Sequence, residues 1–360
     1  MKFSQLLSHF TFMSTALAVP NEISSKHHDQ HPNEKRGVVV VTEYVDQDGK
    51  VVIPPESIVS ATTSAATITN TDTNKQTTTT LSPDGATPTS TTGSSTTNNA
   101  ANGIFKDGIY KCSEFPSFVS GVIPVDWIGL GGWSSIQDSN GQTVTSCEDG
   151  MYCSYACDAG QVKTQWPEDQ PDNGSSLGGL YCKNGYLYRT NTNFDHLCED
   201  TNSQVTVINN VDIGEVVLCR TDYPGSENMD IPTVVGTGQS QPLAVIDQDT
   251  YYKWSGKHTS AQYYVNNAGV SKEDGCIWGD PQSGVGNWAP LVIGAGKANG
   301  LTYISLIPNP NTDKGANFNI KFKGDDLNGS DSCSYIDGKL SSTDGCTVSV
   351  LSGSLEIIFY

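Results

Sequence analysis

The ten cysteines of this chain constrain its fold more than any other feature of the sequence. All of them lie between Cys112 and Cys346, and an even number is typical of a chain whose thiols all pair. The stretch CEDGMYCSYAC, residues 147–157, places three of them in eleven positions. Such a cluster can be a metal site, a redox centre or one corner of a disulfide framework. The compartment in which the chain matures decides among these interpretations.

The start of the chain indicates an oxidising compartment. A basic residue is followed by a mostly apolar stretch and by Ala-Leu-Ala, an A-x-A-type cleavage site, which together predict a secretory signal peptide at residues 1–18. A short buried helix is the alternative, but no amphipathic pattern follows it. The dibasic pair Lys35-Arg36 then predicts a propeptide at residues 19–36 that a processing protease removes.

Thiols that mature in an oxidising compartment pair with one another. The clustered cysteines are separated by five, three and twenty-four residues, whereas structural zinc sites show C-x2-4-C pairs, and no C-x-x-C redox motif is present. We therefore expect five disulfides, each contributing about 2–4 kcal/mol to stability, and neither metal nor cofactor. One local pair, Cys333 with Cys346, would close a 14-residue loop. The expected half-cystines are Cys112, Cys147, Cys153, Cys157, Cys182, Cys198, Cys219, Cys276, Cys333 and Cys346.

Composition divides the chain into a spacer and a folded domain. Within residues 57–97, 23 of 41 residues are Ser or Thr, and none is aromatic or Cys. Such a segment buries too little apolar surface to fold, so we expect residues 37–102 to form a disordered, O-glycosylated spacer. Residues 103–360 contain all six Trp and 14 of the 15 Tyr, which predicts that the core-forming domain lies there.

The apolar runs of this domain are short and separated by turn residues, and no 3.6-residue period is sustained. We expect a mainly β fold, a disulfide-rich β-sandwich with long loops that follows the disordered Ser/Thr-rich segment. The expected strands are VTVINN (205–210), EVVLC (215–219), PLAVI (242–246), LTYISLI (301–307) and NFNIKFK (317–323), with CTVSVLSGSLEIIFY (346–360) as a closing hairpin.

The charge of the domain excludes some partners. Residues 103–360 contain 30 acidic and 14 basic residues, a formal balance of −16, whereas nucleic-acid binding needs a basic face. Beyond the signal peptide no run of about 18 apolar residues could span a membrane, and no lipid-anchor signal is found, so no membrane anchor is expected. Two sequons, at Asn173 and Asn328, predict exposed loops that carry N-linked sugar.

Several loops combine aromatic residues with carboxylates, which are the residue types that bind and cleave sugars. A pair of carboxyl groups supplies the acid and the base of glycoside cleavage. The segment RTDYPGSENMD places Asp222 and Glu227 in one Pro/Gly-containing loop near Arg220. We expect Glu227 to be the acid and Asp222 the nucleophile or base, with Arg220 keeping Asp222 ionised. The residues expected to bind substrate are Arg220, Tyr223, Asp247, Asp249, Trp254, Trp127, Trp166 and Trp288.

Each of these residues also has a structural alternative. Trp and Tyr side chains fill cores, and Asp beside Gly or Pro is common in turns. A separation of five positions in sequence says nothing about distance in space. Other catalytic signatures are missing, since the sequence contains neither G-x-S-x-G nor H-E-x-x-H.

The spacing C-x5-C-x3-C-x24-C resembles the signature of the SUN family of secreted fungal cell-wall proteins. The likeness extends over essentially all of residues 103–360, and the signal peptide, dibasic site and Ser/Thr-rich tract also fit that family's layout. The similar segments are GVIPVDWIGLGGW, KTQWPEDQP, YCKNGYLYR, CRTDYPGSENM, DQDTYYKW, SAQYYVNNAG, GVGNWAPL and YISLIPNPN.

The resemblance implies a secreted glycosidase of the cell wall or cell surface, β-glucosidase-like or β-1,3-glucanase-like. Such a protein would act on β-glucan in wall remodelling, septation and cell separation. The alternative is a non-catalytic wall protein that binds glucan through the same aromatic loops and organises the matrix. No catalytic pair is carried over from the family, and the oligomeric state stays open. A thaumatin-like sandwich with an acidic cleft would suit the composition, by fold-level analogy.

Overall fold

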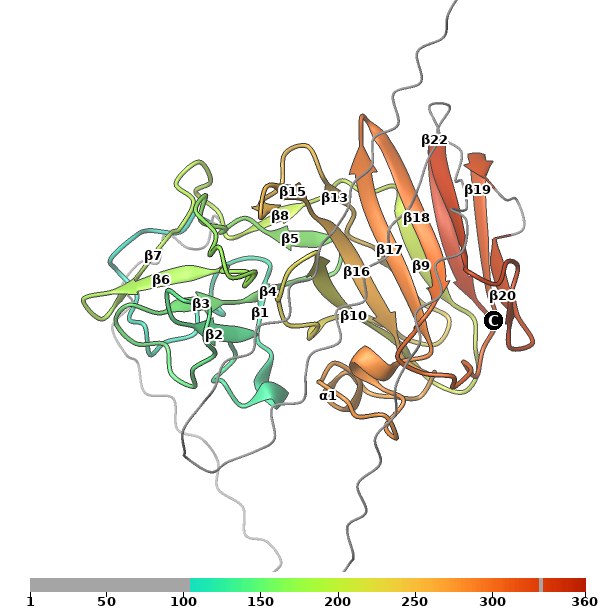
Figure 1. Cartoon of the computed structure of the whole chain (residues 1–360), viewed down its shortest axis with the longest axis horizontal. Helices are drawn as coiled ribbons and strands as arrows, with labels where there is room; N and C mark the ends of the chain where they lie inside the picture. The colour runs from blue at the N-terminus through green and yellow to red at the C-terminus, as the bar shows by residue number, and fades with distance from the viewer. Residues whose placement is uncertain (1–103, 330–332) are drawn as a thin grey trace, which may run out of the picture. The chain divides into compact units, whose positions relative to one another are not determined.

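The computed structural model describes residues 104–329 and 333–360 (Figure 1). The predicted signal peptide, propeptide and Ser/Thr-rich spacer lie outside these residues. The described part is mainly β, as expected, and its α-helix spans only four residues, α1 (Lys272–Gly275). It consists of two consecutive regions, which we call the N-terminal lobe (104–200) and the C-terminal lobe (205–360).

The N-terminal lobe consists of short strands around a small core. A four-stranded sheet has the order β2-β3-β6-β7. Two further two-stranded sheets, β1-β4 and β5-β8, are separate from it. The core is rich in aromatic residues and half-cystines, including Phe105, Trp133, Tyr155 and Cys153. The elements are β1 (Val122–Ile123), η2 (Asp126–Ile128), β2 (Ser135–Gln137), β3 (Tyr152–Ser154), β4 (Ala156–Cys157), β5 (Gln161–Lys163), β6 (Leu180–Lys183), β7 (Tyr186–Tyr188) and β8 (Cys198–Asp200).

The C-terminal lobe is built on a 12-stranded sheet. Its main path is β11-β10-β16-β17-β18-β22-β19-β20-β21, and β9, β12 and β13 join it off this path. These strands are β9 (Val205–Asn209), β10 (Val216–Tyr223), β11 (Ile231–Val235), β12 (Ser240–Pro242), β13 (Ile246–Asp247), β16 (Ser260–Val265), β17 (Leu291–Ala298), β18 (Leu301–Pro308), β19 (Ile320–Gly329), β20 (Ser334–Ile336), β21 (Lys339–Leu340) and β22 (Cys346–Phe359). The remaining elements are the strand pair β14 (Lys253–Trp254) and β15 (Lys257–His258) and the turn η3 (Gly286–Trp288).

Strand β22 pairs with three other strands of this lobe. Its first part, 346–350, pairs with β18, and its last part, 355–359, pairs in parallel with β9, while β19 follows it on the other side. Between the two parts lies Gly353, whose φ of 75° suits glycine. The predicted hairpin at 346–360 is therefore wrong, because the chain bends there and continues as one 14-residue strand.

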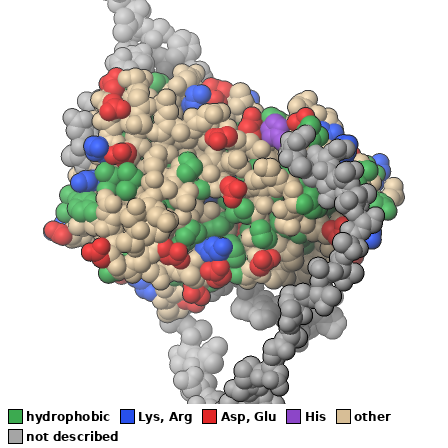
Figure 2. Space-filling view, turned by 180° about the vertical axis from the view of Figure 1, so that it is seen from behind, with side chains coloured by type: hydrophobic (Ala, Val, Ile, Leu, Met, Phe, Trp, Pro, Cys, Tyr) green, Lys and Arg blue, Asp and Glu red, His purple; other side chains and the backbone are tan. Residues whose placement is uncertain are grey.

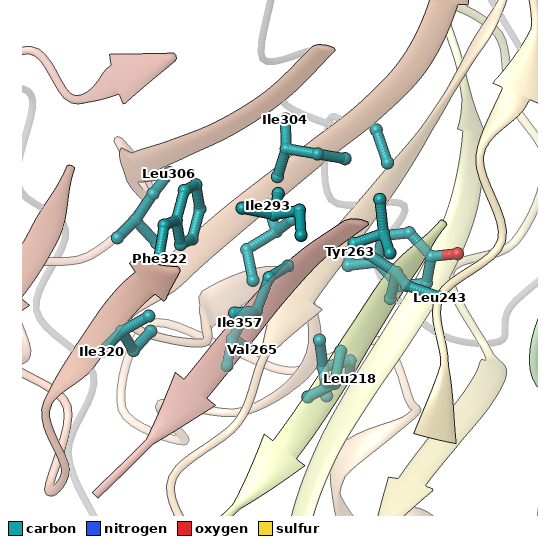
Figure 3. Close-up of a cluster of buried hydrophobic side chains, with 14 of the residues drawn as sticks. Leu218, Leu243, Tyr263, Val265, Ile293, Ile304, Leu306, Ile320, Phe322 and Ile357 are labelled. Carbon is teal, nitrogen blue, oxygen red and sulfur yellow. The ribbon is translucent and has the colours of Figure 1, made fainter. Parts of the chain in front are cut away.

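The main core lies against the inner faces of these strands. Buried side chains from β10, β16, β17, β18, β19 and β22 contact one another there (Figure 3). Alternate residues face this core, as Val216 and Leu218 do on β10, while Val217 and Cys219 face a second cluster on the other side of the sheet. The expected strands at 205–210, 215–219, 301–307 and 317–323 are present, whereas of PLAVI only the two ends lie in strands.

All ten cysteines pair, as expected, and the predicted bridge between Cys333 and Cys346 is confirmed. The cluster at 147–157 contributes one local bridge and one long-range bridge. Three bridges lie within the N-terminal lobe and two within the C-terminal lobe, so none of them links the lobes. The pairs are Cys112–Cys182, Cys147–Cys153, Cys157–Cys198, Cys219–Cys276 and Cys333–Cys346.

Replacing Cys333 and Cys346 together by serine is expected to lower the free energy of unfolding by about 3 kcal/mol. The bridge closes a loop of 13 residues' separation, and the restriction it places on the unfolded chain has that size. Urea unfolding of the variant and the parent, both without reductant, measures the difference. An unchanged midpoint in the serine variant would contradict the prediction.

Candidate active site

The end of β10 places two of the predicted site residues on one face. Arg220 and Asp222 are two positions apart, so both project from the face that carries Leu218 into the core. Strand β11 pairs with β10 only as far as Arg220, whereas β16 pairs with it through Tyr223. The exposed fractions of Arg220 and Asp222 are 3% and 1%, so both charged groups are buried.

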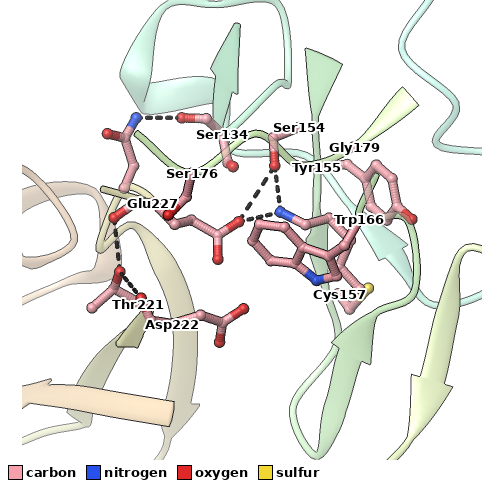
Figure 4. Close-up of polar contacts among 12 residues, drawn as sticks. Ser134, Ser154, Tyr155, Cys157, Trp166, Ser176, Gly179, Thr221, Asp222 and Glu227 are labelled. Carbon is pink, nitrogen blue, oxygen red and sulfur yellow. Dashed lines mark hydrogen bonds and ion pairs between the residues drawn. The ribbon is translucent and has the colours of Figure 1, made fainter. Parts of the chain in front are cut away.

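Hydrogen bonds to the backbone hold Glu227 close to the end of β10. The Thr221 hydroxyl donates to the Glu227 carbonyl oxygen at 2.7 Å, which holds the two ends of the intervening loop together. The neighbouring Asn228 side chain donates to the Ser134 carbonyl oxygen of the N-terminal lobe at 2.7 Å. The Glu227 carboxyl, only 6% exposed, therefore lies at the junction of the two lobes, opposite Asp222 (Figure 4).

The N-terminal lobe supplies a lysine to this junction. Lys163, on β5, is 1% exposed and forms an ion pair with Glu227. Its ammonium also donates to the Ser154 hydroxyl at 2.5 Å and lies 4.1 Å from the centre of the Trp166 ring. Gly178 makes this approach possible, because a Cβ there would lie 2.9 Å from the Lys163 Nζ atom and 2.7 Å from the Trp166 ring.

The Asp222 carboxyl has an unusual protonation equilibrium. Its pKa is raised to about 8, first by burial and then by the neighbouring Glu227, while the charges of Arg220 and Lys163 oppose this rise. The Arg220 Nε atom is 3.8 Å from Asp222 Oδ1, too long for a hydrogen bond. Burial therefore opposes the ionised Asp222 that was expected beside Arg220, because the cost of desolvating the carboxylate outweighs the attraction.

Two carboxyl oxygens of this pair have no hydrogen-bond partner among the residues that the structure describes. They are Asp222 Oδ1 and Glu227 Oε2, both fully buried. A single proton on Asp222, shared with Glu227, would satisfy both atoms at once. A third buried carboxyl, Asp230, has its pKa raised well above the usual range by burial and by the charge of Glu227, and neither of its oxygens has a hydrogen-bond partner in the described part of the chain.

Aromatic side chains surround the carboxyl pair. Trp166 stacks on Tyr252 with 3.7 Å between ring centres and donates its indole N–H to the Tyr251 hydroxyl at 2.7 Å. That hydroxyl lies 3.1 Å from Asp222 Oδ2 and 3.0 Å from the Lys163 carbonyl oxygen. Tyr251 thus links the lobes as well as contacting Asp222.

The loop between the carboxyls, residues 223–226, packs closely against the N-terminal lobe. Ser176 and Ser226 each donate their backbone N–H to the other's hydroxyl, at 2.8 and 2.9 Å. Gly225 lies so near Ser176 that a Cβ would be 2.1 Å from its hydroxyl oxygen, and 3.3 Å from the Trp254 ring. These contacts fix the loop, hereafter the 223–226 loop, against the N-terminal lobe.

The structure brings together some of the predicted substrate-binding residues and separates others. Trp166 contacts the cluster directly, Trp254 contacts the 223–226 loop, and Tyr223 belongs to that loop. Asp247 instead pairs with Lys297, and Asp249 accepts a hydrogen bond from the backbone of Asn299. Trp127 lines a separate pocket, and Trp288 lies in η3.

Sequence reasoning missed Lys163 and did not assign roles to Asp230, Tyr251 or Tyr252. A lysine in a three-residue strand gives no sequence sign of burial. The two tyrosines adjoin Trp254 in DQDTYYKW, so their position in an aromatic- and acid-rich segment was a usable signal. Lys163 could be found only from the packing of one lobe on the other.

The described residues carry neither a clear metal site nor a membrane helix. No group of three or more His, Cys, Asp or Glu side chains in this part of the chain is arranged to hold a metal ion. Within the same residues, no helix has the length and apolar character needed to cross a membrane. On the face in Figure 2, acidic side chains are scattered and the Lys and Arg drawn there form no continuous patch.

The described part of the chain is a two-lobed β protein that is cross-linked by disulfides and has a buried pair of carboxyls at the junction of its lobes. Residues 107–348 match the family model described as Beta-glucosidase (SUN family). This chain belongs to the SUN family, as the cysteine spacing predicts.

Named relatives are similar along most of the chain. A Saccharomyces cerevisiae protein named beta-glucosidase-like protein NCA3, mitochondrial, is 51% identical over 358 residues, 99% of this chain and 98% of the relative. The probable secreted beta-glucosidase UTH1 of the same species is 59% identical over 264 residues, 72% of each chain. The secreted beta-glucosidase SIM1 of Candida albicans is 58% identical over 260 residues, 71% of this chain and 69% of the relative. No solved structure matches the chain.

Proposed function

We propose that this protein is a secreted glycoside hydrolase that cleaves β-1,3-glucan in the cell wall, during wall remodelling, septation and cell separation. Membership of a family described as beta-glucosidases supports the reaction class, and the names of two relatives support secretion. The name of a third relative includes the word mitochondrial, so cell fractionation with a cell-wall marker is the test of location. The observation that carries the proposal is the buried pair of carboxyls at the lobe junction, in which Glu227 is ion-paired with Lys163 and burial raises the pKa of Asp222.

The environments of the two carboxyls assign them different roles. Asp222, with a pKa of about 8, keeps its proton in acidic and neutral solution and is our general acid. Glu227, paired with Lys163, is our base or nucleophile. This assignment is the reverse of the one expected from the sequence, because the buried lysine that pairs with Glu227 was not foreseen.

The pair must open before it can act. Both carboxyls are buried, whereas a retaining glycosidase holds a sugar between two carboxyls about 5–5.5 Å apart and an inverting one between carboxyls about 6.5–9.5 Å apart. We propose that substrate displaces the 223–226 loop, which breaks the paired Ser176–Ser226 hydrogen bonds and moves Glu227 away from Asp222. Tyr252 and Trp254, which contact this loop, then supply the stacking surface for the sugar.

Laminarin oligosaccharides test this proposal. We expect Asp222→Asn and Glu227→Gln each to lower turnover by about 100-fold or more, because general acid–base catalysis contributes about 10²–10⁴-fold. Reducing ends and product lengths by mass spectrometry are the readout, with circular dichroism to confirm folding. Asp249→Asn is the matched control, since that carboxyl is exposed and accepts only a backbone hydrogen bond. Unchanged turnover in both pair variants would remove them from the mechanism.

A second candidate function has its own observation. Both carboxyls are buried, and neither of the two best-defined pockets of the described residues is lined by them, which favours a non-catalytic wall protein that binds glucan and organises the matrix. Such a protein would bind laminarin tightly without turnover at any pH. The same oligosaccharide experiment, extended to an equilibrium binding measurement, separates the two functions.

A further inference from the structure

A pocket of about 720 Å³ lies between the two lobes and apart from the carboxyl pair. This volume falls within the range of about 300–1,000 Å³ that is usual for ligand sites. None of Lys163, Asp222 and Glu227 lines it. Both lobes contribute to its wall, the N-terminal lobe through Ile123, Pro124, Asp126, Trp127, Asp158 and Ala159, and the C-terminal lobe through Pro232, Val234, Gln241, Lys272 and Glu273.

Trp127 is fixed in this wall. Its indole N–H donates to the Cys276 carbonyl oxygen at 2.9 Å, and Cys276 is itself bridged to Cys219 on β10. The ring packs against the buried clusters on either side of it and stays partly exposed. The Lys272 ammonium lies 5.4 Å from the ring centre. A rigid, partly exposed aromatic ring is the kind of anchor that a ligand can contact without ordering new side chains.

The rest of the wall contains both apolar and polar groups. Pro124 and Pro232 are apolar, whereas Asp126, Asp158 and Glu273 present exposed carboxylates. The carboxylates outnumber the one lysine, so a polyanion would be repelled, and an apolar ligand would leave the polar groups unpaired. A neutral sugar chain fits both features, since its C–H faces stack on aromatic rings and its hydroxyls donate to carboxylates.

We propose that this pocket binds a segment of a neutral β-glucan chain, at a distance from the carboxyl pair. The choice of glucan among neutral polysaccharides rests on the proposed function. The site holds the polymer against both lobes, whether or not the carboxyl pair cleaves it. Because both lobes line the pocket, the bound chain stabilises their association.

Retention of the protein on insoluble β-1,3-glucan tests the proposal. We expect Trp127→Ala to weaken binding at least about tenfold, the usual loss for a central aromatic anchor. Since Trp127 also packs against the interior, the exposed double variant Asp158→Asn with Glu273→Gln provides an independent test, with an expected loss of about threefold to tenfold. Trp278→Ala is the control, because Trp278 is 47% exposed and lies outside the pocket wall.

The outcomes separate this proposal from the proposed function. Weaker retention of the pocket variants, with retention of Trp278→Ala unchanged, supports the pocket even if no turnover is found. Unchanged retention of the folded Asp158→Asn/Glu273→Gln variant together with unchanged retention of Trp127→Ala would overturn it. Equal retention of the parent protein on chitin would overturn glucan as the occupant.

Discussion

Replacing Lys163 by methionine is expected to lower the free energy of unfolding by about 3–5 kcal/mol. The substitution leaves the Glu227 carboxylate buried at the lobe junction without its cation, and a broken buried pair has this cost. Methionine keeps most of the side-chain volume, so the loss reports on charge more than on packing. Urea unfolding at neutral pH, followed by fluorescence and by circular dichroism, measures it.

Two variants make this result specific to the buried pair. Lys297→Met breaks the ion pair between Lys297 and Asp247, whose side chains are 43% and 36% exposed. Because this pair is on the surface, the substitution should lower the free energy of unfolding by less than about 1 kcal/mol. Replacing both Lys163 and Glu227 by apolar residues should recover most of the stability, because neither partner is then left charged in the interior. A Lys163→Met variant no less stable than Lys297→Met would refute a stabilising role for the junction pair.

The protein is expected to lose stability as the pH rises from about 4 to about 8, and Asp222→Asn to reduce this loss. An Asp in an unfolded chain has a pKa of about 3.9, whereas that of Asp222 in the fold is about 8. Between these values the folded state keeps a proton that the unfolded state has released, so raising the pH favours unfolding. One such proton corresponds to a slope of at most about 1.4 kcal/mol per pH unit.

Urea midpoints measured at several pH values compare the slopes directly. Asp222→Asn removes the titrating group and keeps its shape, so its slope between about pH 5 and 7 should be shallower than the parent's. Asp230, whose pKa is raised in the same direction, retains part of the effect, and a variant with both residues replaced should be nearly flat. Identical slopes in the parent and in Asp222→Asn would mean that Asp222 is ionised in the fold.

The framework of the fold was predictable because it depends on local patterns. The even cysteine count, the alternation in NFNIKFK and the absence of a helical period all act over short stretches of chain. The prediction of a hairpin at 346–360 was wrong because the sequence shows Gly353 but does not show which strands pair on either side of it. Whether glycine marks a turn or a bend depends on partners such as β9, which lie far away in sequence.

The candidate site was only partly predictable, for a related reason. Asp222, Glu227 and Arg220 lie within eight residues of one another, so a single segment suggested all three. The pKa of Asp222 depends partly on Lys163, and its hydrogen bonding depends on Tyr251, and both of these residues reach the site from other elements. The reversed roles that we propose for Asp222 and Glu227 rest on these distant neighbours, which no single segment of the sequence could supply.

The position of β22 has a consequence for biosynthesis. This strand follows every other described strand in the chain, yet it is the one that pairs with β18, β19 and β9 together. Until it emerges from the ribosome, β9 lacks its parallel partner and the main core lacks Ile357 and Phe359. The C-terminal lobe therefore folds only after synthesis of this strand, and a chain that stops near Gly353 leaves exposed strand edges for quality control to recognise.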